Sequence, residues 1–138
     1  MIAYVADASA LIKVVIEEPE SAIVIRFFSS TTTGAPALLR VEAANVLRRV
    51  VKSKKATHAE ARRALTRILD LVEILPETEA EAHLTLDLAI ALDHSAQDCR
   101  YLAAAMAAKV PLVTADEGFA RKARAAGHDA RIVSELPA

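Results

Sequence analysis

Short apolar runs alternate with longer segments of helical periodicity along the whole chain. Each run is apolar enough to form a strand that is buried on both faces, as strands of a parallel sheet are, and is too short for a helix. The predicted strands are IAYVA at 2–6, VEILP at 72–76, PLVTA at 111–115 and ARIV at 130–133, with a further short strand inside the loop SSTTTGAP at 29–36.

The longer segments repeat apolar residues every three or four positions, which predicts helices. Thr57 followed by Glu60 is the pattern of a capping box at a helix start, and Gly127 is the kind of residue that ends a helix. Pro19 separates the first two helices. The predicted helices cover residues 10–16, 20–28, 38–52, 57–71, 77–92, 96–108 and 117–125, and the helix at 77–92 is expected to be amphipathic.

This alternation of strands and helices predicts an α/β fold. Its central sheet should be mostly parallel, with helices on both faces. The chain has 138 residues, of which 54% are hydrophobic, and this is enough to bury one substantial core. Since no repeat, linker or low-complexity segment divides the sequence, we expect one domain over residues 1–138.

Composition and charge exclude several other classes of protein. Cys99 is the only cysteine, so an internal disulfide is excluded. No apolar run approaches the roughly 20 residues that cross a bilayer, and the N-terminus lacks the pattern of a secretory signal. The formal net charge of -1 does not indicate nucleic-acid binding overall, but it leaves room for a local basic patch. We therefore expect a cytoplasmic protein with no membrane partner.

Four acidic residues stand where their side chains could reach one site. In a parallel sheet, ligands bind outside the carboxyl ends of the strands, near a reversal of strand order. Asp7 and Asp116 follow predicted strands, while Glu42 and Asp98 interrupt apolar helical segments. Each acid also has a structural interpretation, either as a helix cap or as a surface carboxylate that pairs with arginine.

A cluster of these acids would need a cation. Two carboxylates about 5 Å apart repel each other by roughly 3 kcal/mol at an effective dielectric near 20. Oxygen ligands of this kind suit Mg²⁺ or Mn²⁺, and phosphate chemistry is their common use. The histidines have no metal-ligand spacing and are interpreted as ordinary helix or loop residues: His58, His83, His94 and His128.

Four motifs, in this order, carry a resemblance to a known family. They are DASALIK at 7–13, PALLRVEAANVLRR at 36–49, DCRYLAAA at 98–105 and LVTAD at 112–116. The chain resembles PIN-domain ribonucleases, and specifically VapC-type toxins of type II toxin–antitoxin systems. The resemblance covers nearly the whole chain and implies a PIN-like three-layer α/β/α sandwich.

The resemblance also implies a set of site residues. The family's four acids, which act as metal ligands and catalytic residues, are matched by Asp7, Glu42, Asp98 and Asp116. Polar positions that support them are matched by Ser9, Asn45 and Thr114. One departure is Gln97, because the residue before the third acid is often aromatic in relatives.

The activity that the resemblance implies is Mg²⁺-dependent or Mn²⁺-dependent cleavage of RNA. In this reaction a water would attack the phosphate, so no side-chain nucleophile is needed, and the product would carry a 5′-phosphate. The segment RRVVKSKK at 48–55, with Arg62, Arg63 and Arg67, is locally basic and could contact RNA, although a solvated surface explains it equally well. The implied partners are a VapB-like cognate antitoxin and a second copy of the chain in a homodimer.

Other classes fit the residues less well. A response-regulator receiver has an acidic pair after the first strand and a lysine after the fifth, whereas this chain has Asp7 alone and no such lysine. A haloacid-dehalogenase-like phosphatase needs a second aspartate at the position of Ser9. A non-catalytic PIN-like or receiver-like binding module remains the alternative to a nuclease.

Overall fold

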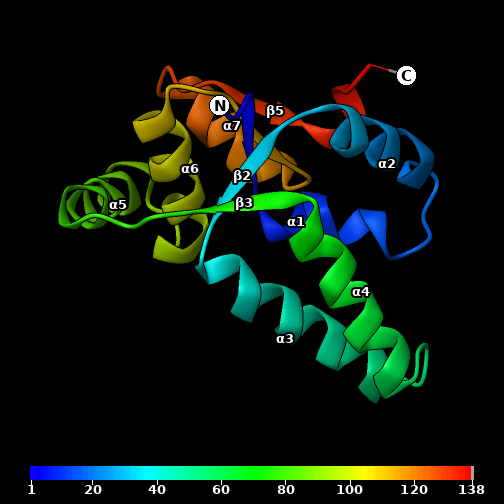
Figure 1. The fold of residues 1–138 in the computed structure, drawn as a ribbon. Helices are drawn as coiled ribbons and strands as arrows, with labels where there is room; N and C mark the ends of the chain where they lie inside the picture. Colours follow the sequence, from blue (N-terminus) through cyan, green and yellow to red (C-terminus); the bar gives the residue numbers. More distant parts are fainter. Residues whose placement is uncertain (138) are drawn as a thin grey trace.

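A five-stranded parallel sheet forms the centre of the molecule. The computed structural model describes residues 1–137, and its strands are β1 (Tyr4–Ala6), β2 (Thr33–Pro36), β3 (Val72–Leu75), β4 (Leu112–Thr114) and β5 (Ala130–Ile132). Their order across the sheet is β3-β2-β1-β4-β5, and every neighbouring pair is parallel. The predicted α/β fold with a parallel sheet is therefore confirmed (Figure 1).

Helices connect all the strands and cover the sheet. Right-handed crossovers place the β1–β2 and β2–β3 connections on one face and the β3–β4 and β4–β5 connections on the other, which gives the three-layer sandwich. The α-helices are α1 (Ala8–Leu11), α2 (Ser21–Ser30), α3 (Leu38–Lys52), α4 (His58–Asp70), α5 (Glu79–Leu92), α6 (Ala96–Ala108) and α7 (Glu117–Ala125), and two short 3₁₀ helices are η1 (Ile12–Val14) and η2 (Val133–Glu135).

Strand order reverses at the centre of the sheet. The chain moves outward from β1 through β2 to β3, then returns to β4 on the other side of β1. The carboxyl ends of β1 and β4 are thus neighbours, with Ala6 in register with Val113 and the Asp7 amide donating to the Val113 carbonyl at 3.2 Å. This switch point is where a parallel α/β sheet opens a crevice for ligands.

Helix α6 is the most buried helix and lies directly on the sheet. It contacts β1, β2 and β4, and α5 packs on it from outside. Ala103, Ala104 and Ala105 are all buried. These small side chains let the helix approach the strands closely, so the start of α6 is fixed relative to the carboxyl ends of β1 and β4.

Helices α3 and α4 form an antiparallel pair that extends away from the sheet at the bottom of Figure 1. The predicted capping box starts α4, since the Glu60 amide donates to the Thr57 hydroxyl at 3.1 Å and the Thr57 amide donates to the Glu60 carboxylate at 2.8 Å. Leu39, Ala43 and Leu47 are the buried residues of α3. The opposite side of α3 is therefore left for polar and basic residues.

Three details of the predicted elements were wrong. The strands predicted at 2–6 and 111–115 are each two residues shorter, and the helix at 10–16 is instead α1 followed by η1. Branched side chains at Val14 to Ile16 disfavour a longer α-helix, and Lys13 turns to form ion pairs with Glu18 and with Glu20, at 2.9 Å for the latter. Helix α5 is not clearly amphipathic, because Leu86 and Ile90 are exposed. None of the described helices is long and apolar enough to cross a membrane.

Candidate active site

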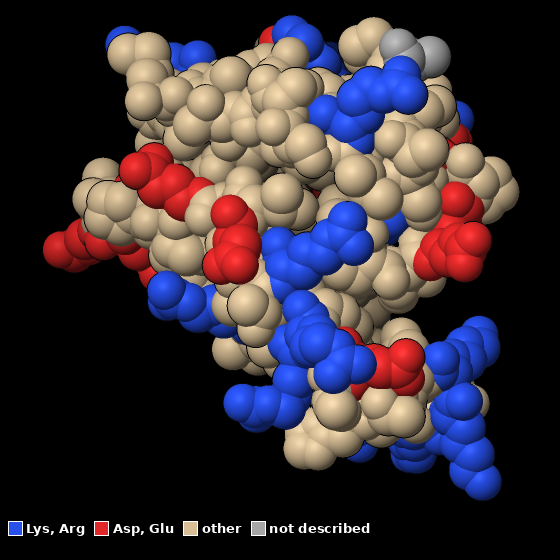
Figure 2. Space-filling model, turned by 45° about the vertical axis from the view of Figure 1, so that its right-hand side comes forward, with Lys and Arg blue, Asp and Glu red and all other residues tan. Residues whose placement is uncertain are grey.

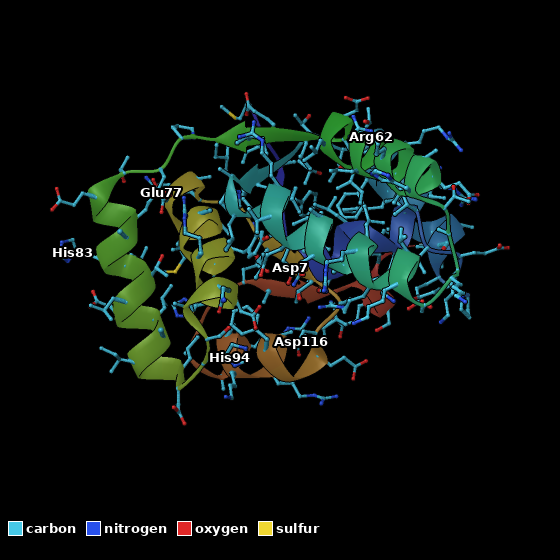
Figure 3. All side chains as sticks on the ribbon, turned by 90° about the horizontal axis from the view of Figure 1, so that it is seen from below. Asp7, Arg62, Glu77, His83, His94 and Asp116 are labelled. Atoms are coloured by element: carbon cyan, nitrogen blue, oxygen red, sulfur yellow. The ribbon has the colours of Figure 1, made fainter. Side chains whose placement is uncertain are left out.

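One cavity of about 270 Å³ opens at the carboxyl ends of β1 and β4, beside the starts of α3 and α6. Of the seven predicted site residues, six line it and the seventh, Thr114, is fully buried next to Asp7. Figure 3 shows Asp7 and Asp116 close together near the middle of this side of the molecule. The residues that line the cavity are Asp7, Ala8, Ser9, Glu42, Asn45, Val46, Arg49, Asp98, Tyr101 and Asp116.

Asp7 both caps a helix and faces the cavity. Its Oδ1 accepts hydrogen bonds from the Ala10 amide at 3.0 Å and the Ser9 hydroxyl at 2.6 Å, and its Oδ2 accepts one from the Thr114 hydroxyl at 2.5 Å. A carboxylate has about four acceptor positions, so three bonds leave room for one more partner. The capping interpretation and a ligand role are therefore compatible.

Burial sets the protonation of Asp7. Asp7 is only 5% exposed, and burial raises its pKa to about 6, against the opposing effect of the hydrogen bonds from Ser9, Thr114 and Ala10. The negative charge of Asp98 raises this pKa further. A group that is costly to ionise is thus held next to other carboxylates, and a bound cation would remove that cost.

Ser9 and Thr114 join the ends of the two central strands. The Ser9 hydroxyl donates to Asp7 and accepts from the Ala115 amide at 3.0 Å. The Thr114 hydroxyl also donates to Asp7 and accepts from the Asp116 amide at 3.1 Å. The two hydroxyls therefore fix Asp7 relative to the chain that carries Asp116.

Glu42 is held from across the cavity by Tyr101. The Tyr101 hydroxyl donates to Glu42 Oε1 at 2.5 Å and joins α6 to α3. Burial and this hydrogen bond raise the pKa of Tyr101 further above its usual value, so the phenol stays a donor. Asn45, one turn further along α3, is exposed at the cavity.

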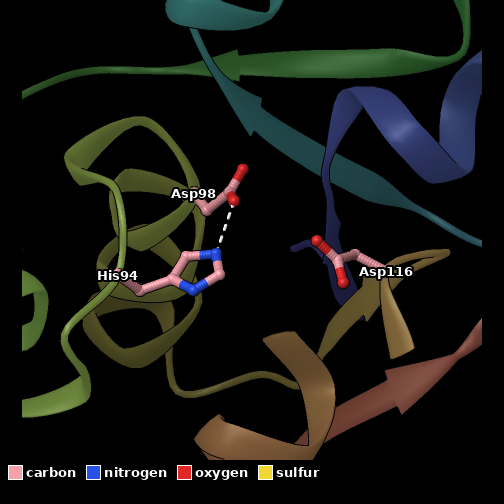
Figure 4. A group of neighbouring side chains, drawn as sticks. All are labelled: His94, Asp98 and Asp116. Atoms are coloured by element: carbon pink, nitrogen blue, oxygen red, sulfur yellow. Dashed lines mark hydrogen bonds and ion pairs between the residues drawn. The ribbon is translucent and has the colours of Figure 1, made fainter. Parts of the chain in front are cut away.

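Asp98 and Asp116 are the other two acids that line the cavity. Asp98 lies in the first turn of α6, and its Oδ2 is 2.7 Å from Nε2 of His94 (Figure 4). Asp116 caps α7 by accepting from the Phe119 amide at 3.0 Å. Its side chain is exposed, so capping leaves the other carboxylate oxygen accessible.

His94, which was interpreted from the sequence as an ordinary helix or loop residue, lies beside two of the acids. One ligand atom each from His94, Asp98 and Asp116 lies within 4.8 Å of the others. The signal in the sequence was the four-residue spacing between His94 and Asp98, which places the two side chains on one side of the helix start. Sequence reasoning also missed Tyr101 and Arg49 as residues of the cavity.

The electrostatics of the cavity suit a small hard cation. Four carboxylates line it, and among the described residues there only Arg49 is basic. Oxygen donors from four different elements are what Mg²⁺ or Mn²⁺ accepts, together with waters. The arrangement can therefore bind a divalent ion and present a phosphate group to it.

Comparison with known proteins identifies the family. The structure is similar to PAE2754 from Pyrobaculum aerophilum, with a TM-score of 0.78 and 23% identity, and the match covers 98% of this chain and 86% of the other. It is also similar to FitAcB from Neisseria gonorrhoeae, with a TM-score of 0.73 and 17% identity, and the match covers 96% of this chain and 99% of the other.

A third similar structure is that of VapBC2 from Rickettsia felis bound to a DNA fragment from its promoter. The TM-score is 0.64 at 17% identity, and the match covers 86% of this chain and 91% of the other. At these identities the likeness shows the fold alone. No curated protein sequence matches significantly. The family model of the PIN domain, however, matches residues 4–125. Since this is most of the chain, the protein belongs to the PIN domain family.

Proposed function

We propose that this protein is a divalent-metal-dependent endoribonuclease that acts in the cytoplasm as the toxin of a toxin–antitoxin pair. The observation that carries the proposal is the convergence of Asp7, Glu42, Asp98 and Asp116 on one cavity. These acids come from four separate elements, and each has its own hydrogen-bond partner. Membership of the PIN family, whose members are typically nucleases, supports the activity.

The four carboxylates would hold Mg²⁺ or Mn²⁺. When bound, such an ion supplies charge neutralisation at the scissile phosphate and lowers the pKa of a water. The chain's own contribution is to keep the acids in place before RNA arrives. Asp7 is the most rigid of them, because three donors hold its carboxylate in a buried position.

The supporting residues have separate tasks in this proposal. Ser9 and Thr114 occupy the Asp7 oxygens and keep β1 and β4 in register at the site. Asn45 offers an uncharged amide on the side of the cavity formed by α3. Arg49 is placed one turn beyond Asn45 and would offset the charge of a phosphate that enters from this side.

A basic surface next to the cavity supports an RNA substrate. Helices α3 and α4 and the turn between them carry a group of exposed Lys and Arg side chains, and Figure 2 shows basic side chains gathered over this lower part of the molecule. Such a surface binds the phosphate backbone without reading sequence. Its members are Arg48, Arg49, Lys52, Lys54, Lys55, Arg62, Arg63 and Arg67.

The partners in this proposal are a VapB-like antitoxin and a second copy of the chain. The similarity to VapBC2 and FitAcB supports the antitoxin partner. An antitoxin would suppress cleavage by covering the acidic cavity. The homodimer follows from the resemblance to VapC-type toxins and is tested by the mass of the purified protein in solution.

Cleavage of total cellular RNA tests the proposed activity. The RNA would be incubated with the unmodified protein in Mg²⁺, with the unmodified protein in EDTA, and with the Asp98→Asn variant in Mg²⁺. New 5′ ends would be mapped by sequencing. We expect discrete 5′-phosphate ends that require both the metal and Asp98. Asp87→Asn, an exposed acid on α5, is the matched control and should cleave normally.

Two outcomes would count against the proposal. Cleavage that persists in EDTA or in a folded Asp98→Asn variant would exclude the four-carboxylate site. Absence of cleavage by a folded protein that also binds no Mn²⁺ would favour a non-catalytic PIN module.

A further inference from the structure

The turn between α5 and α6 fixes the backbone of His94. Asp93 ends α5 in the left-handed conformation with a φ of 48°, and the His94 amide donates back to the Ala89 carbonyl at 3.1 Å. Ser95 then caps α6 by accepting from the Asp98 amide at 3.3 Å. His94 is therefore placed between a helix end and a helix start, four residues before Asp98.

The imidazole of His94 is held on three sides. Its Nε2 lies 2.7 Å from Asp98 Oδ2, and its ring lies against that of Phe119 with 4.6 Å between the centroids. Its Nδ1 lies 3.4 Å from Nζ of Lys122, which also donates to the Asp93 carbonyl at 3.1 Å. The side chain is only 19% exposed, so the ring has little freedom to rotate.

The position of Lys122 decides which ring nitrogen carries the proton. An ammonium group donates hydrogen bonds and accepts none, so the Nδ1 that it faces acts as the acceptor. Nε2 then carries a proton and donates it in the hydrogen bond to Asp98. A chain of hydrogen bonds runs from Lys122 through His94 to Asp98.

We propose that His94 is a positioning residue for Asp98, and that Lys122 fixes the tautomer that this role requires. The inference rests on the proposed metal-dependent function. His94 holds Oδ2 of Asp98, while Oδ1 accepts no hydrogen bond from residues 1–137 and is left for the cation. The orientation of metal-binding carboxylates by such hydrogen bonds is common in metal sites.

Direct binding of the metal by His94 is the competing role. It would require a lone pair on Nε2 and a proton on Nδ1, and that proton would face the Lys122 ammonium. Two donors would then oppose each other. The geometry therefore favours donation to Asp98 over ligation.

Mn²⁺ binding measured by electron paramagnetic resonance tests the proposal without relying on cleavage. We expect His94→Ala to weaken Mn²⁺ affinity by about tenfold, the lower end of the usual effect of losing such a partner. His94→Gln keeps an N–H donor near the position of Nε2, so its affinity should stay within about threefold of the original. Lys122→Met should give an intermediate loss.

The control is His83→Ala. His83 also lies four residues from an acid, 3.8 Å from Glu79, but its side chain is 72% exposed on the outer side of α5, away from the cavity (Figure 3). This variant should bind Mn²⁺ as the original protein does. Thermal unfolding midpoints of all variants establish that they are folded, and the Gln and Met variants carry the test where the Ala variant does not fold.

Several results would overturn the positioning role. One is an unchanged affinity in a folded His94→Ala protein, and another is a His94→Gln affinity as weak as that of His94→Ala. A spin-echo signal of directly bound ¹⁴N that His94→Ala removes would show ligation instead. If the unmodified protein binds no Mn²⁺, the proposed function fails together with this inference. If only the positioning role is wrong, the unmodified protein still binds Mn²⁺ and His94→Ala binds it equally well.

Discussion

Two charged residues at the start of α6, Asp98 and Arg100, have opposite surroundings. Arg100 is 6% exposed and is paired with acids, since its Nε lies 3.2 Å from Glu77 Oε1 and its Nη1 lies 3.4 Å from Glu81 Oε1. Asp98 faces a cavity whose other charges are mainly carboxylates. The same turn of α6 thus carries Arg100, whose charge is balanced by acids on the α5 side, and Asp98, whose charge is not balanced by the other carboxylates on the cavity side. We call these the compensated and the uncompensated cluster.

This difference in charge pairing indicates that the Arg100 cluster stabilises the fold, whereas the acidic cavity is suited to binding a ligand. Burying a charge is costly unless an opposite charge accompanies it, and the Arg100 cluster meets that requirement within the protein. The acidic cavity does not meet it, because Asp98 and Asp116 bring carboxylate oxygens within 4.8 Å of each other. A pair of carboxylates at about 5 Å costs roughly 3 kcal/mol before screening. The fold tolerates this cost where a ligand from outside is expected to complete the site.

The largest expected effect is the loss of activity in Asp7→Asn. Removing one carboxylate from the proposed metal site should lower the RNA cleavage rate on the order of a thousandfold, because transition-state charge would lose its metal partner. The measurement is cleavage at saturating Mg²⁺, with circular dichroism to establish the fold. A folded variant with near-normal cleavage would show that Asp7 is only a cap.

Arg100→Met breaks the compensated cluster instead. Glu81, only 14% exposed, would lose its partner, while the more exposed Glu77 would return to water. We expect the free energy of unfolding to fall by about 3 kcal/mol, the lower end for a broken buried pair. Urea unfolding measures it. Mn²⁺ affinity of the folded variant should not change, and a large change would mean that the two clusters are coupled.

The free energy of unfolding should depend on pH because the carboxyl group of Asp7, in the acidic cavity, has a raised pKa. The pKa of Asp7 is about 6 in the folded protein, above its ordinary value of 3.8, so the folded state binds more protons between these values. Stability of the metal-free protein should therefore fall as pH rises through this window, by at most about 3 kcal/mol.

Asp7→Asn provides the reference for this titration. Urea unfolding at pH 4 and pH 7 should show that the variant lacks this part of the pH dependence and is the more stable protein at pH 7. Saturating Mg²⁺ should restore stability to the unmodified protein only. The same pH dependence in both proteins would contradict a costly carboxylate at this position.

Tyr101→Phe should have the smallest effect. It removes the hydrogen bond to Glu42 but keeps the ring in the core. We expect about a tenfold loss of Mn²⁺ affinity, because Glu42 would keep its charge and lose its orientation. Calorimetric titration with Mn²⁺ measures this loss. An unchanged affinity would place Glu42 outside the cation site.

Local features of the fold could be predicted from the sequence, because neighbouring residues determine them. The capping box of Thr57 and Glu60 formed as predicted. So did the helix end at Gly127, which has a φ of 89° and lies in a turn closed by the bond from the His128 amide to the Ala123 carbonyl. The acids after β1 and β4 could also be found, since polar residues interrupt apolar strands there.

Contacts between distant segments could not be predicted. The order of the strands depends on which crossovers pack best, and no local pattern records it. Tyr101 and Glu42 are 59 residues apart, and Thr114 and Asp7 are 107 apart. His94 was overlooked because its link to Asp98 crosses a helix start, and its link to Lys122 exists only once α7 has packed against the turn before α6.

A crystal soaked in Mn²⁺ and recorded at the manganese absorption edge tests the central claim most directly. The account predicts an anomalous peak in the cavity, within coordination distance of oxygens from Asp7 and Asp98 and close to Glu42 and Asp116. The Asp7→Asn crystal should lack that peak. An empty cavity at saturating Mn²⁺, or a peak only elsewhere on the surface, would contradict the claim that these four acids form one cation site.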